Sequence, residues 1–570
     1  MAKFRVLAAY AIFAAALPGQ VTFDRLLHPE KEPQNWLTYS GGYNSHRFSP
    51  LTQINRTNVK KLQMKWVYHP DYSKMENTPL VVDGILYAGT AQEVVALDAV
   101  TGRQYWKYSR PFNRSDYVGQ HAYEVNKGMA ISGNTLFWAT VHDCHLIAID
   151  AKTGHVLWDV PYADWKMGYQ FNVAPLIVKN MVILGQATNE MGSNCWIAAY
   201  DVKTGKEIWR FYTAPNSPDD PAAKTWHGDA WKHGGSPIWN GGSYDPETNL
   251  TFWGTGNPNP GWNGDVRAPG DNLYSDCVVA LDADTGKLKW YYQFTPGDEY
   301  DWDSTQVPVL ADIEWKGKPR KVMFWANRNG FFYVLDRVTG EFLMGKPFIK
   351  QTWAVGIDEN GRPIKAQDFW PKPMGGIAVM PGSQGGTNWY PPSYSPRTGL
   401  FYMSVWDNYL AFSNKSDPGP WRQGQLYNGS SWWAGYGQSA PTSGRGNSPP
   451  RRNRAAMTAA ARGRTLPNYK TEDEGYGAIR AIDPKTGEKK WEFKMVNYTE
   501  NGVLSTAGDL VFGGGMDGDF VALDAKTGEL LWSVYLGGAN ASGPISYAVN
   551  GKQYIVGSGA GTMYVFALPD

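Results

Sequence analysis

The chain has 570 residues, a formal net charge of +1, and a composition that is 42% hydrophobic and 19% charged. This balance excludes a strongly basic nucleic-acid-binding surface and an intrinsically disordered chain, so we expect no nucleic-acid partner. Tryptophan (26 residues), tyrosine (33) and glycine (63) are abundant, which favours an all-β propeller or barrel over a helical protein.

Residues 1–20 are predicted to be a signal peptide. Lys3 and Arg5 precede an apolar stretch from Val6 to Leu17, which is shorter than the roughly 20 apolar residues that a membrane span requires. An uncleaved N-terminal anchor is the alternative. Because no later segment is apolar enough to cross a bilayer, the sequence predicts a periplasmic or secreted protein without an integral membrane domain.

The three cysteines, Cys144, Cys195 and Cys277, are far apart, and the chain has no CxxC or CxxCH motif. This spacing excludes a covalently attached c-type haem and a thiolate zinc site. An odd number of cysteines in an exported protein leaves at least one thiol unpaired. We expect all three to be buried.

One phrase recurs along the chain and predicts its architecture. An apolar alternation typical of a strand leads into Asp-x-x-Thr-Gly, which is typical of a turn, and a second strand follows that ends on tryptophan. The copies are Ala96–Trp106, Ala148–Trp158, Ala199–Trp209, Ala280–Trp290, Ala481–Trp491 and Ala522–Trp532, with a degenerate copy at Val334–Met344. Each copy is predicted to be a hairpin whose tryptophan packs between neighbouring units.

The spacing of the copies predicts a large propeller. The first copies recur after about 50 residues, which is the length of a four-stranded blade. Weaker echoes at Tyr244 and Tyr394 fill longer gaps, so the count is eight or nine units; a β-solenoid would need shorter and more uniform repeats. We expect residues 21–570 to form one propeller domain. Residues 439–464, rich in Ser, Pro, Gly, Ala and Arg, are predicted to be an inserted loop, with a basic docking site for an acidic electron acceptor as the alternative.

Oxygen-bearing side chains stand outside this phrase, where strands end. Glu190 follows an apolar strand, Asn257 lies in Gly254-Thr255-Gly256-Asn257-Pro258, and Asp301 and Asp303 belong to the acidic run 298–303. The alternative interpretation of that run is a solvated acidic turn with no role in binding. Taken together, the four residues form an oxygen-only ligand set, which suits calcium or a lanthanide better than zinc or copper. Trp239 ends no repeat phrase and is therefore free to face a ligand.

The chain resembles the quinoprotein methanol/ethanol dehydrogenase family over nearly its whole length after the signal. The resemblance rests on Pro33–Trp36 with Arg47–Leu51, the Gly254–Pro258 motif, the run Asp298–Asp303, Asn327–Gly330 and Ser505–Gly508. It implies an eight-bladed β-propeller with tryptophan-docking repeats that binds pyrroloquinoline quinone (PQQ) and a calcium or lanthanide ion at its channel.

The resemblance also implies roles for individual residues. Asp301 would be the catalytic base, and the metal ligands would be Glu190, Asn257 and Asp301, joined by Asp303 as the added acid of the lanthanide-dependent branch. Trp239 would be the floor on which the quinone stacks. The remaining quinone contacts would be Glu76, Lys127, Arg328 and Asn388.

The chain departs from the family in the segment that covers the other face of the quinone. Where the family has two adjacent cysteines, this sequence reads His121-Ala122, and Lys127 replaces an arginine. We expect His121 to lie opposite Trp239, with a surface position as the alternative. Asn172 and Ala187 stand where the family has hydroxyl residues, which weakens the expected hold on the quinone carboxylates.

The expected activity is oxidation of a small primary alcohol to an aldehyde, with electrons passed to a separate acceptor such as a soluble cytochrome c. Two alternatives belong to other classes. A cofactor-free scaffold propeller would carry no channel acids. A membrane-bound sugar dehydrogenase would carry N-terminal membrane helices.

Overall fold

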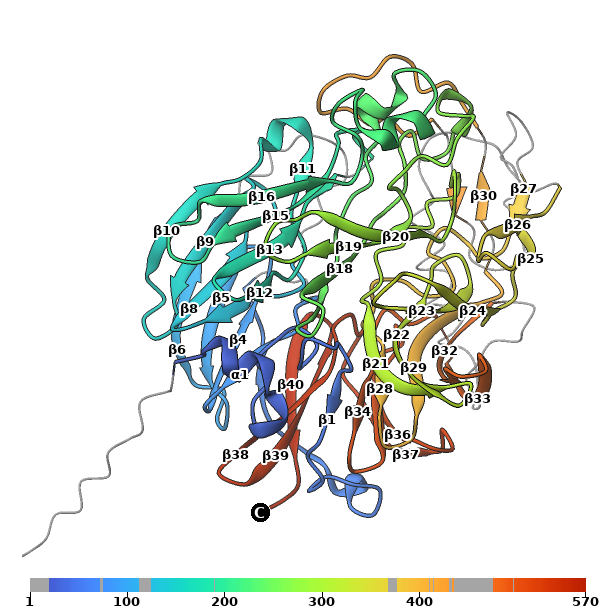
Figure 1. The fold of residues 1–570 in the computed structure, drawn as a ribbon. Helices are drawn as coiled ribbons and strands as arrows, with labels where there is room; N and C mark the ends of the chain where they lie inside the picture. The colour runs from blue at the N-terminus through green and yellow to red at the C-terminus, as the bar shows by residue number, and fades with distance from the viewer. Residues whose placement is uncertain are drawn as a thin grey trace, which may run out of the picture.

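The computed structural model describes residues 20–71, 75–111, 125–188, 190–367, 377–409, 411–413, 415–429, 433–434, 475–495 and 497–570. Within these ranges nearly all regular structure is β, and the sheets form an eight-bladed propeller (Figure 1). No helix in these ranges has the length and apolar character that crossing a membrane requires. The predicted all-β, eight-bladed fold is therefore confirmed, whereas the signal peptide and the basic loop at 439–464 lie outside the described residues, apart from Gln20.

Each blade has four antiparallel strands, of which the first is the innermost, and in blade 7 the short strand β1 adds a fifth, parallel strand beside the first. The strands of blades 1 to 4 are β3 (Leu80–Val82), β4 (Ile85–Gly89), β5 (Glu93–Asp98) and β6 (Gln104–Ser109); β7 (Ala130–Ser132), β8 (Thr135–Ala139), β9 (His145–Asp150) and β10 (Val156–Pro161); β12 (Leu176–Val178), β13 (Met181–Gly185), β15 (Trp196–Asp201) and β16 (Glu207–Tyr212); β17 (Ser243–Asp245), β18 (Leu250–Gly254), β19 (Cys277–Asp282) and β20 (Leu288–Gln293).

The strands of blades 5 to 8 follow the same pattern. They are β21 (Val309–Trp315), β22 (Lys318–Ala326), β23 (Phe331–Asp336) and β24 (Phe342–Pro347); β28 (Ser393–Ser395), β29 (Leu400–Asp407), β32 (Tyr476–Asp483) and β33 (Glu488–Met495); β34 (Leu504–Thr506), β35 (Leu510–Gly514), β36 (Asp519–Asp524) and β37 (Leu530–Tyr535); β38 (Ile545–Val549), β39 (Lys552–Gly559), β40 (Thr562–Ala567) and β2 (Gln63–Tyr68).

Short elements lie outside the blades. They are α1 (Phe23–Leu27), β1 (Phe48–Ser49), the pairs β11 (Tyr169–Gln170) with β14 (Ala187–Thr188) and β25 (Ala354–Ile357) with β26 (Pro363–Lys365), the sheet of β27 (Ile377–Val379), β30 (Ala411–Ser413) and β31 (Trp433–Ala434), and six 3-10 turns: η1 (Pro29–Lys31), η2 (Val59–Lys61), η4 (Trp165–Met167), η5 (Pro221–Thr225), η6 (Ala230–His233) and η7 (Gly264–Val266).

The recurring phrase forms the outer hairpin of each of blades 1 to 7 and docks as expected. In blade 1, Asp98 Oδ1 accepts hydrogen bonds from the backbone and the hydroxyl of Thr101, and Gly102 completes the turn at φ +73°. That glycine lies under the ring of Trp66, whose Nε1–H donates to the Ala99 carbonyl at 3.3 Å. Because a side chain at Gly102 would overlap the Trp66 ring, the turn needs glycine at this position.

The eight blades are accounted for by seven phrases and one closing blade. The echoes at Tyr244 and Tyr394 lie in β17 and β28, so they share a blade with the phrase that follows and add no unit. Blade 8 combines β38, β39 and β40 with β2 from the N-terminal region, which pairs antiparallel with β40. The ring is thus closed by strands from both ends of the chain.

The segment before β2 lies against the innermost strand or inner turn of every blade. Val21 pairs with Gly133 of blade 2, the Gln34 carbonyl accepts from the Ala548 N–H of blade 8, and Trp36 pairs with Val81 of blade 1. The following residues continue in order through blades 3 to 7 by the pairs Tyr43–Ile177, Ser45–Ser243, His46–Leu310, His46–Tyr394 and Arg47–Ser505. We call residues 20–49 the hub.

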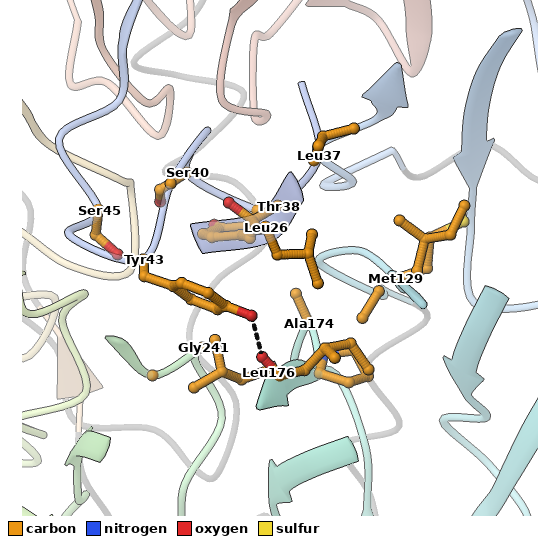
Figure 2. Close-up of a pocket in the computed structure, with 17 residues that line it drawn as sticks. Leu26, Leu37, Thr38, Ser40, Tyr43, Ser45, Met129, Ala174, Leu176 and Gly241 are labelled. Atoms are coloured by element: carbon orange, nitrogen blue, oxygen red, sulfur yellow. Dashed lines mark hydrogen bonds between the residues drawn. The ribbon is translucent and has the colours of Figure 1, made fainter. Parts of the chain in front are cut away.

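A small cavity lies between the hub and the inner strands of blades 2 to 4 (Figure 2). Leu26, Leu37 and Tyr43 line it from the hub, and Met129 and Leu176 line it from the blades. The Tyr43 hydroxyl donates to the Ile177 carbonyl at 2.6 Å across one side of it. None of the candidate site residues lines this cavity, so it is separate from the site described next.

Candidate active site

The topology of a blade gathers the candidate residues at one face of the propeller. In a four-stranded antiparallel sheet, the connection that enters the first strand and the connection between the second and third strands lie at the same end. The residues that enter a first strand are Glu76, Lys127, Trp239, Asp301, Asp303 and Asn388. Those between second and third strands are Glu190, Asn257 and Arg328. The hub pairs with Gly133, in the turn between β7 and β8 at the other end, so it closes the opposite face.

Asp303 is the centre of the acidic group. Its Oδ1 accepts from the Asn257 backbone N–H at 2.7 Å, and its Oδ2 accepts from Trp239 Nε1 at 3.1 Å and from Arg328 Nη1 at 2.5 Å. The side chain is 8% exposed. Three segments that are distant in the sequence therefore meet on one carboxylate, and the interpretation of the acidic run as a solvated turn is wrong.

Glu190 is held by two amides. Its Oε1 accepts from Asn257 Nδ2 at 3.0 Å and its Oε2 from Asn259 Nδ2 at 2.7 Å. Burial, followed by repulsion from Asp303, raises the pKa of Glu190 to about 7. Since the amide nitrogen of Asn257 donates to Glu190, the side-chain oxygen of Asn257 stays available to bind a metal ion. That it does so stays a prediction.

Asp301 is more exposed than Asp303. Its side chain is 27% exposed, and its carboxylate lies 3.5 Å from Arg328 Nη2. Burial raises the pKa of Asp301 well above its usual range, and Arg328 opposes this shift. Both Asp301 (φ 59°) and Glu190 (φ 56°) have left-handed backbone conformations, which are uncommon outside glycine and are concentrated at functional sites.

A cation and two indole rings form the adjoining part of the site. Lys127 Nζ lies 3.6 Å from Glu76 Oε2, 5.1 Å from the ring centre of Trp239 and 4.8 Å from that of Trp389. The side chain is 2% exposed, and burial lowers the pKa of Lys127. Asn388 is fixed beside these rings by bonds to Gln384 and to the Trp389 backbone. These contacts bring Glu76, Lys127 and Trp239 together, and their role in binding a quinone stays a prediction.

The described residues suit the groups that the sequence pointed to. Several buried polar atoms near the site lack a hydrogen-bond partner: Arg328 Nε, Asn172 Oδ1, Gln186 Oε1 and Ser383 Oγ. Such atoms are costly unless a ligand or water satisfies them. Three mutually repelling carboxylates gain from a hard cation, although no three His, Cys, Asp or Glu side chains in the described part of the chain already form a metal shell. Convergence of four ligands on one ion stays a prediction.

Other expectations have mixed outcomes. His121 lies outside the described residues, so its place opposite Trp239 stays a prediction. Ala187 is buried, and the backbone carbonyl of Asn172 accepts from the Lys127 N–H at 3.0 Å. The three cysteines are buried, as expected. Sequence reasoning missed Asn259 and Trp389, although both stand next to residues that it had selected.

Comparisons with known proteins match the chain to one family. Residues 36–346 and 359–555 match the family described as PQQ: glucose/ethanol/alcohol dehydrogenase, beta-propeller domain. The chain is 38% identical to the quinohemoprotein alcohol dehydrogenase ADH-IIG of Pseudomonas putida over 96% of this chain and 75% of that protein, and 36% identical to the quinoprotein alcohol dehydrogenase PedH of Pseudomonas putida over 95% and 89%.

Solved structures agree at the level of the whole fold. A structure of ADHIIG from Pseudomonas putida HK5 superimposes with a TM-score of 0.86 at 35% identity, covering 97% of this chain and 83% of that one. A europium-containing methanol dehydrogenase superimposes with a TM-score of 0.82 at 31% identity, covering 96% and 100%. The chain therefore belongs to the PQQ-dependent alcohol dehydrogenase family of β-propellers.

Proposed function

We propose that this protein oxidises primary alcohols to aldehydes with bound PQQ and a calcium or lanthanide ion. The observation that carries the proposal is the partly exposed Asp301 carboxylate, which lies beside Arg328 and interacts with the acidic groups of Glu190 and Asp303. A general base must be accessible to substrate and must be held in place. Asp301 meets both requirements.

The chain's own residues would divide the remaining tasks. Glu190, Asn257, Asp301 and Asp303 offer oxygen ligands to the ion, and Trp239 offers a flat face on which the cofactor can stack. Lys127, Glu76, Asn388 and Arg328 offer the polar contacts around its edge. When bound, the quinone supplies the acceptor for the hydrogen and electrons of the alcohol carbon, and the metal polarises it.

The proton of the alcohol hydroxyl passes to a carboxylate oxygen of Asp301. Burial raises the pKa of Asp301 well above its usual range, which suits a group that must hold a proton, and Arg328, 3.5 Å from the carboxylate, opposes that rise. Asp303 is bonded to Arg328 and Trp239 and is less exposed. Asp303 therefore serves to hold the site and Asp301 to accept the proton.

Location and electron transfer belong to the same proposal. The apolar stretch Val6–Leu17 supports export to the periplasm or beyond. No CxxCH motif is present in the sequence, so the electrons would leave to a separate acceptor such as a soluble cytochrome c.

Reconstitution tests the proposal. The metal-free protein is incubated with PQQ and either calcium or lanthanum, and reduction of an artificial dye is followed with ethanol, benzyl alcohol and glucose as substrates. We expect dye reduction with the alcohols only when both quinone and metal are present. Activity with glucose alone, or no activity with any of them, would contradict the assignment.

A further inference from the structure

A loop from blade 6 reaches across the site face to the segments that carry the metal-ligand candidates. Residues 416–429, which we call the strap, are closed at their base by a hydrogen bond from the Ser416 N–H to the Gly429 carbonyl at 2.9 Å. In Figure 1 the strap is the orange loop near the top, beside the green segment that contains η5 and η6. No repeat phrase and no predicted site residue falls in it.

One side of the strap is bonded to the turn that follows Asn257 and Asn259. Asn428 accepts from the Trp262 N–H at 2.8 Å, and the Ser416 carbonyl accepts from Asn263 Nδ2 at 2.8 Å. Lys415, just before the strap, lies 2.5 Å from Asp265. The strap is therefore fixed to the loop that presents the amide ligands.

The other side is bonded to the backbone of Glu190 itself. The Tyr427 N–H donates to the Glu190 carbonyl at 2.7 Å, and Trp421 Nε1–H donates to the Met191 carbonyl at 2.8 Å. Met191 is fully buried, so its carbonyl depends on a protein donor. Trp421 is itself held by stacking on His233, with ring centres 4.2 Å apart and an interplanar angle of 14°.

The segment that receives these bonds is strained. Glu190 (φ 56°) and Gly192 (φ +65°) are both left-handed, a conformation that is unfavourable for a non-glycine residue such as Glu190 and persists only where neighbours enforce it. A Cβ on Gly192 would lie 2.9 Å from Tyr427 and 3.0 Å from Trp421. The strap thus packs directly against the turn that points the Glu190 carboxylate at Asn257.

We infer that Trp421 and Tyr427 are positioning residues, which hold the Glu190 turn and the Asn257 loop at the separation that the metal ion requires. This inference rests on the proposed function, because it needs Glu190 to be a metal ligand. Residues that hold metal ligands in place without binding the metal themselves typically contribute about 10–100-fold to metal affinity. The strap would supply that support through backbone carbonyls.

The test compares metal affinities of the full-length, quinone-loaded protein. Trp421→Phe keeps a ring on His233 but removes the N–H donated to Met191, and Gly192→Ala pushes the turn away from the strap. Gln423→Ala is the control, because Gln423 is an exposed side chain of the same strap whose contact with Lys166 is 3.5 Å long. Lanthanum and calcium titrations are followed by calorimetry, and thermal unfolding is recorded for each variant.

We expect Trp421→Phe and Gly192→Ala to weaken metal binding about 10–100-fold, with turnover recovering at excess metal and Gln423→Ala unchanged. Equal affinities in wild type and Trp421→Phe would overturn the inference while leaving the proposed function standing. A lower unfolding temperature with unchanged metal affinity would also overturn it, because the strap would then only stabilise the fold. A wild-type protein that takes up neither ion would overturn the proposed function and the inference with it.

Discussion

The acidic residues of the site differ in what surrounds them, and this difference assigns their tasks. Asp303 is bonded to a backbone N–H, an indole and a guanidinium, whereas Asp301 keeps a more exposed carboxylate at 3.5 Å from the same guanidinium. The first arrangement favours a fixed structural charge and the second a group that can exchange a proton.

Replacing Asp301 by asparagine removes the base but preserves its size. Because Asp303 still binds Arg328, we expect the fold and quinone binding to be retained. Turnover should fall about 10²–10⁴-fold, the usual contribution of a general base. Stopped-flow dye reduction measures the rate, and quinone absorbance of the reconstituted protein checks loading. A variant with wild-type turnover would mean that another group accepts the proton.

Replacing Asp303 by alanine removes one negative charge from the site. A trivalent ion gains more from each added carboxylate than a divalent ion does, so we expect the variant to lose lanthanum affinity more than calcium affinity. The measurement is the ratio of the two dissociation constants in wild type and variant. If calcium supports full wild-type activity and the ratio is unchanged in the variant, Asp303 does not select the metal, and its role is limited to its hydrogen bonds with Asn257, Trp239 and Arg328.

The candidate site could be predicted in part because its residues interrupt a regular pattern. Glu190, Asn257 and Asp303 stand outside the repeat phrase, which made them visible in the sequence. Asn259 could not be separated from Asn257, since only the fold shows that both amides reach the same carboxylate. Trp389 could not be predicted from the sequence, because its contact is with Lys127, which lies in another blade.

At the scale of the element, the hairpin phrase was predictable because its parts are local. Asp, Thr and Gly satisfy one another within five residues, as in Asp98–Gly102. The regular repeat also predicts that the tryptophan packs between blades. Trp106 in addition bonds the Ala151 carbonyl of the next blade, whereas Trp290 Nε1 has no such partner among the described residues. Blade 8 and the strap were not predictable, because neither carries the phrase and both depend on contacts between distant segments.

The docking interface between blades 3 and 4 can be tested at one glycine. A Cβ at Gly286 (φ +68°) would lie 2.3 Å from Trp209, whereas Gly399 (φ +69°) has open space at the same backbone angle. We expect Gly399→Ala to cost about 1 kcal/mol from backbone strain and Gly286→Ala a further 1–3 kcal/mol, roughly the cost of overpacking. Thermal unfolding at a fixed scan rate compares them. Equal losses would mean that the ring does not constrain the turn.

At the scale of the whole molecule, the hub contacts all eight blades. His46 is a hub residue that can titrate. Its Nε2–H donates to the Leu310 carbonyl of blade 5 at 2.6 Å, and its backbone carbonyl accepts from the Tyr394 N–H of blade 6 at 2.8 Å. Burial lowers the pKa of His46 to about 4, so the hub contains a group that resists protonation only while the protein is folded.

This shift predicts a loss of stability in acid. The unfolded chain binds a proton at His46 near pH 6.5, whereas the folded protein binds it only near pH 4. The free energy of unfolding is therefore highest, as far as His46 is concerned, above pH 6.5, and it declines as the pH falls toward 4. His46→Gln keeps an amide donor for Leu310 and does not titrate. We expect the difference in free energy of unfolding between pH 7.5 and 4.5 to shrink in the variant. An unchanged difference would show that other groups govern acid sensitivity.

The closure of the ring by both ends of the chain has a consequence for the order of folding. Strand β2 is synthesised long before its partner β40, and Gln53 bonds to Gln553 across 500 residues of sequence. Contacts at such separation make folding slow, because the chain must first lose the entropy of a long loop. We therefore expect blades 1 to 7 to form hairpin by hairpin while the circle stays open. Closure by β2 would then be the final step, and a chain shortened before β40 would remain an open, aggregation-prone arc.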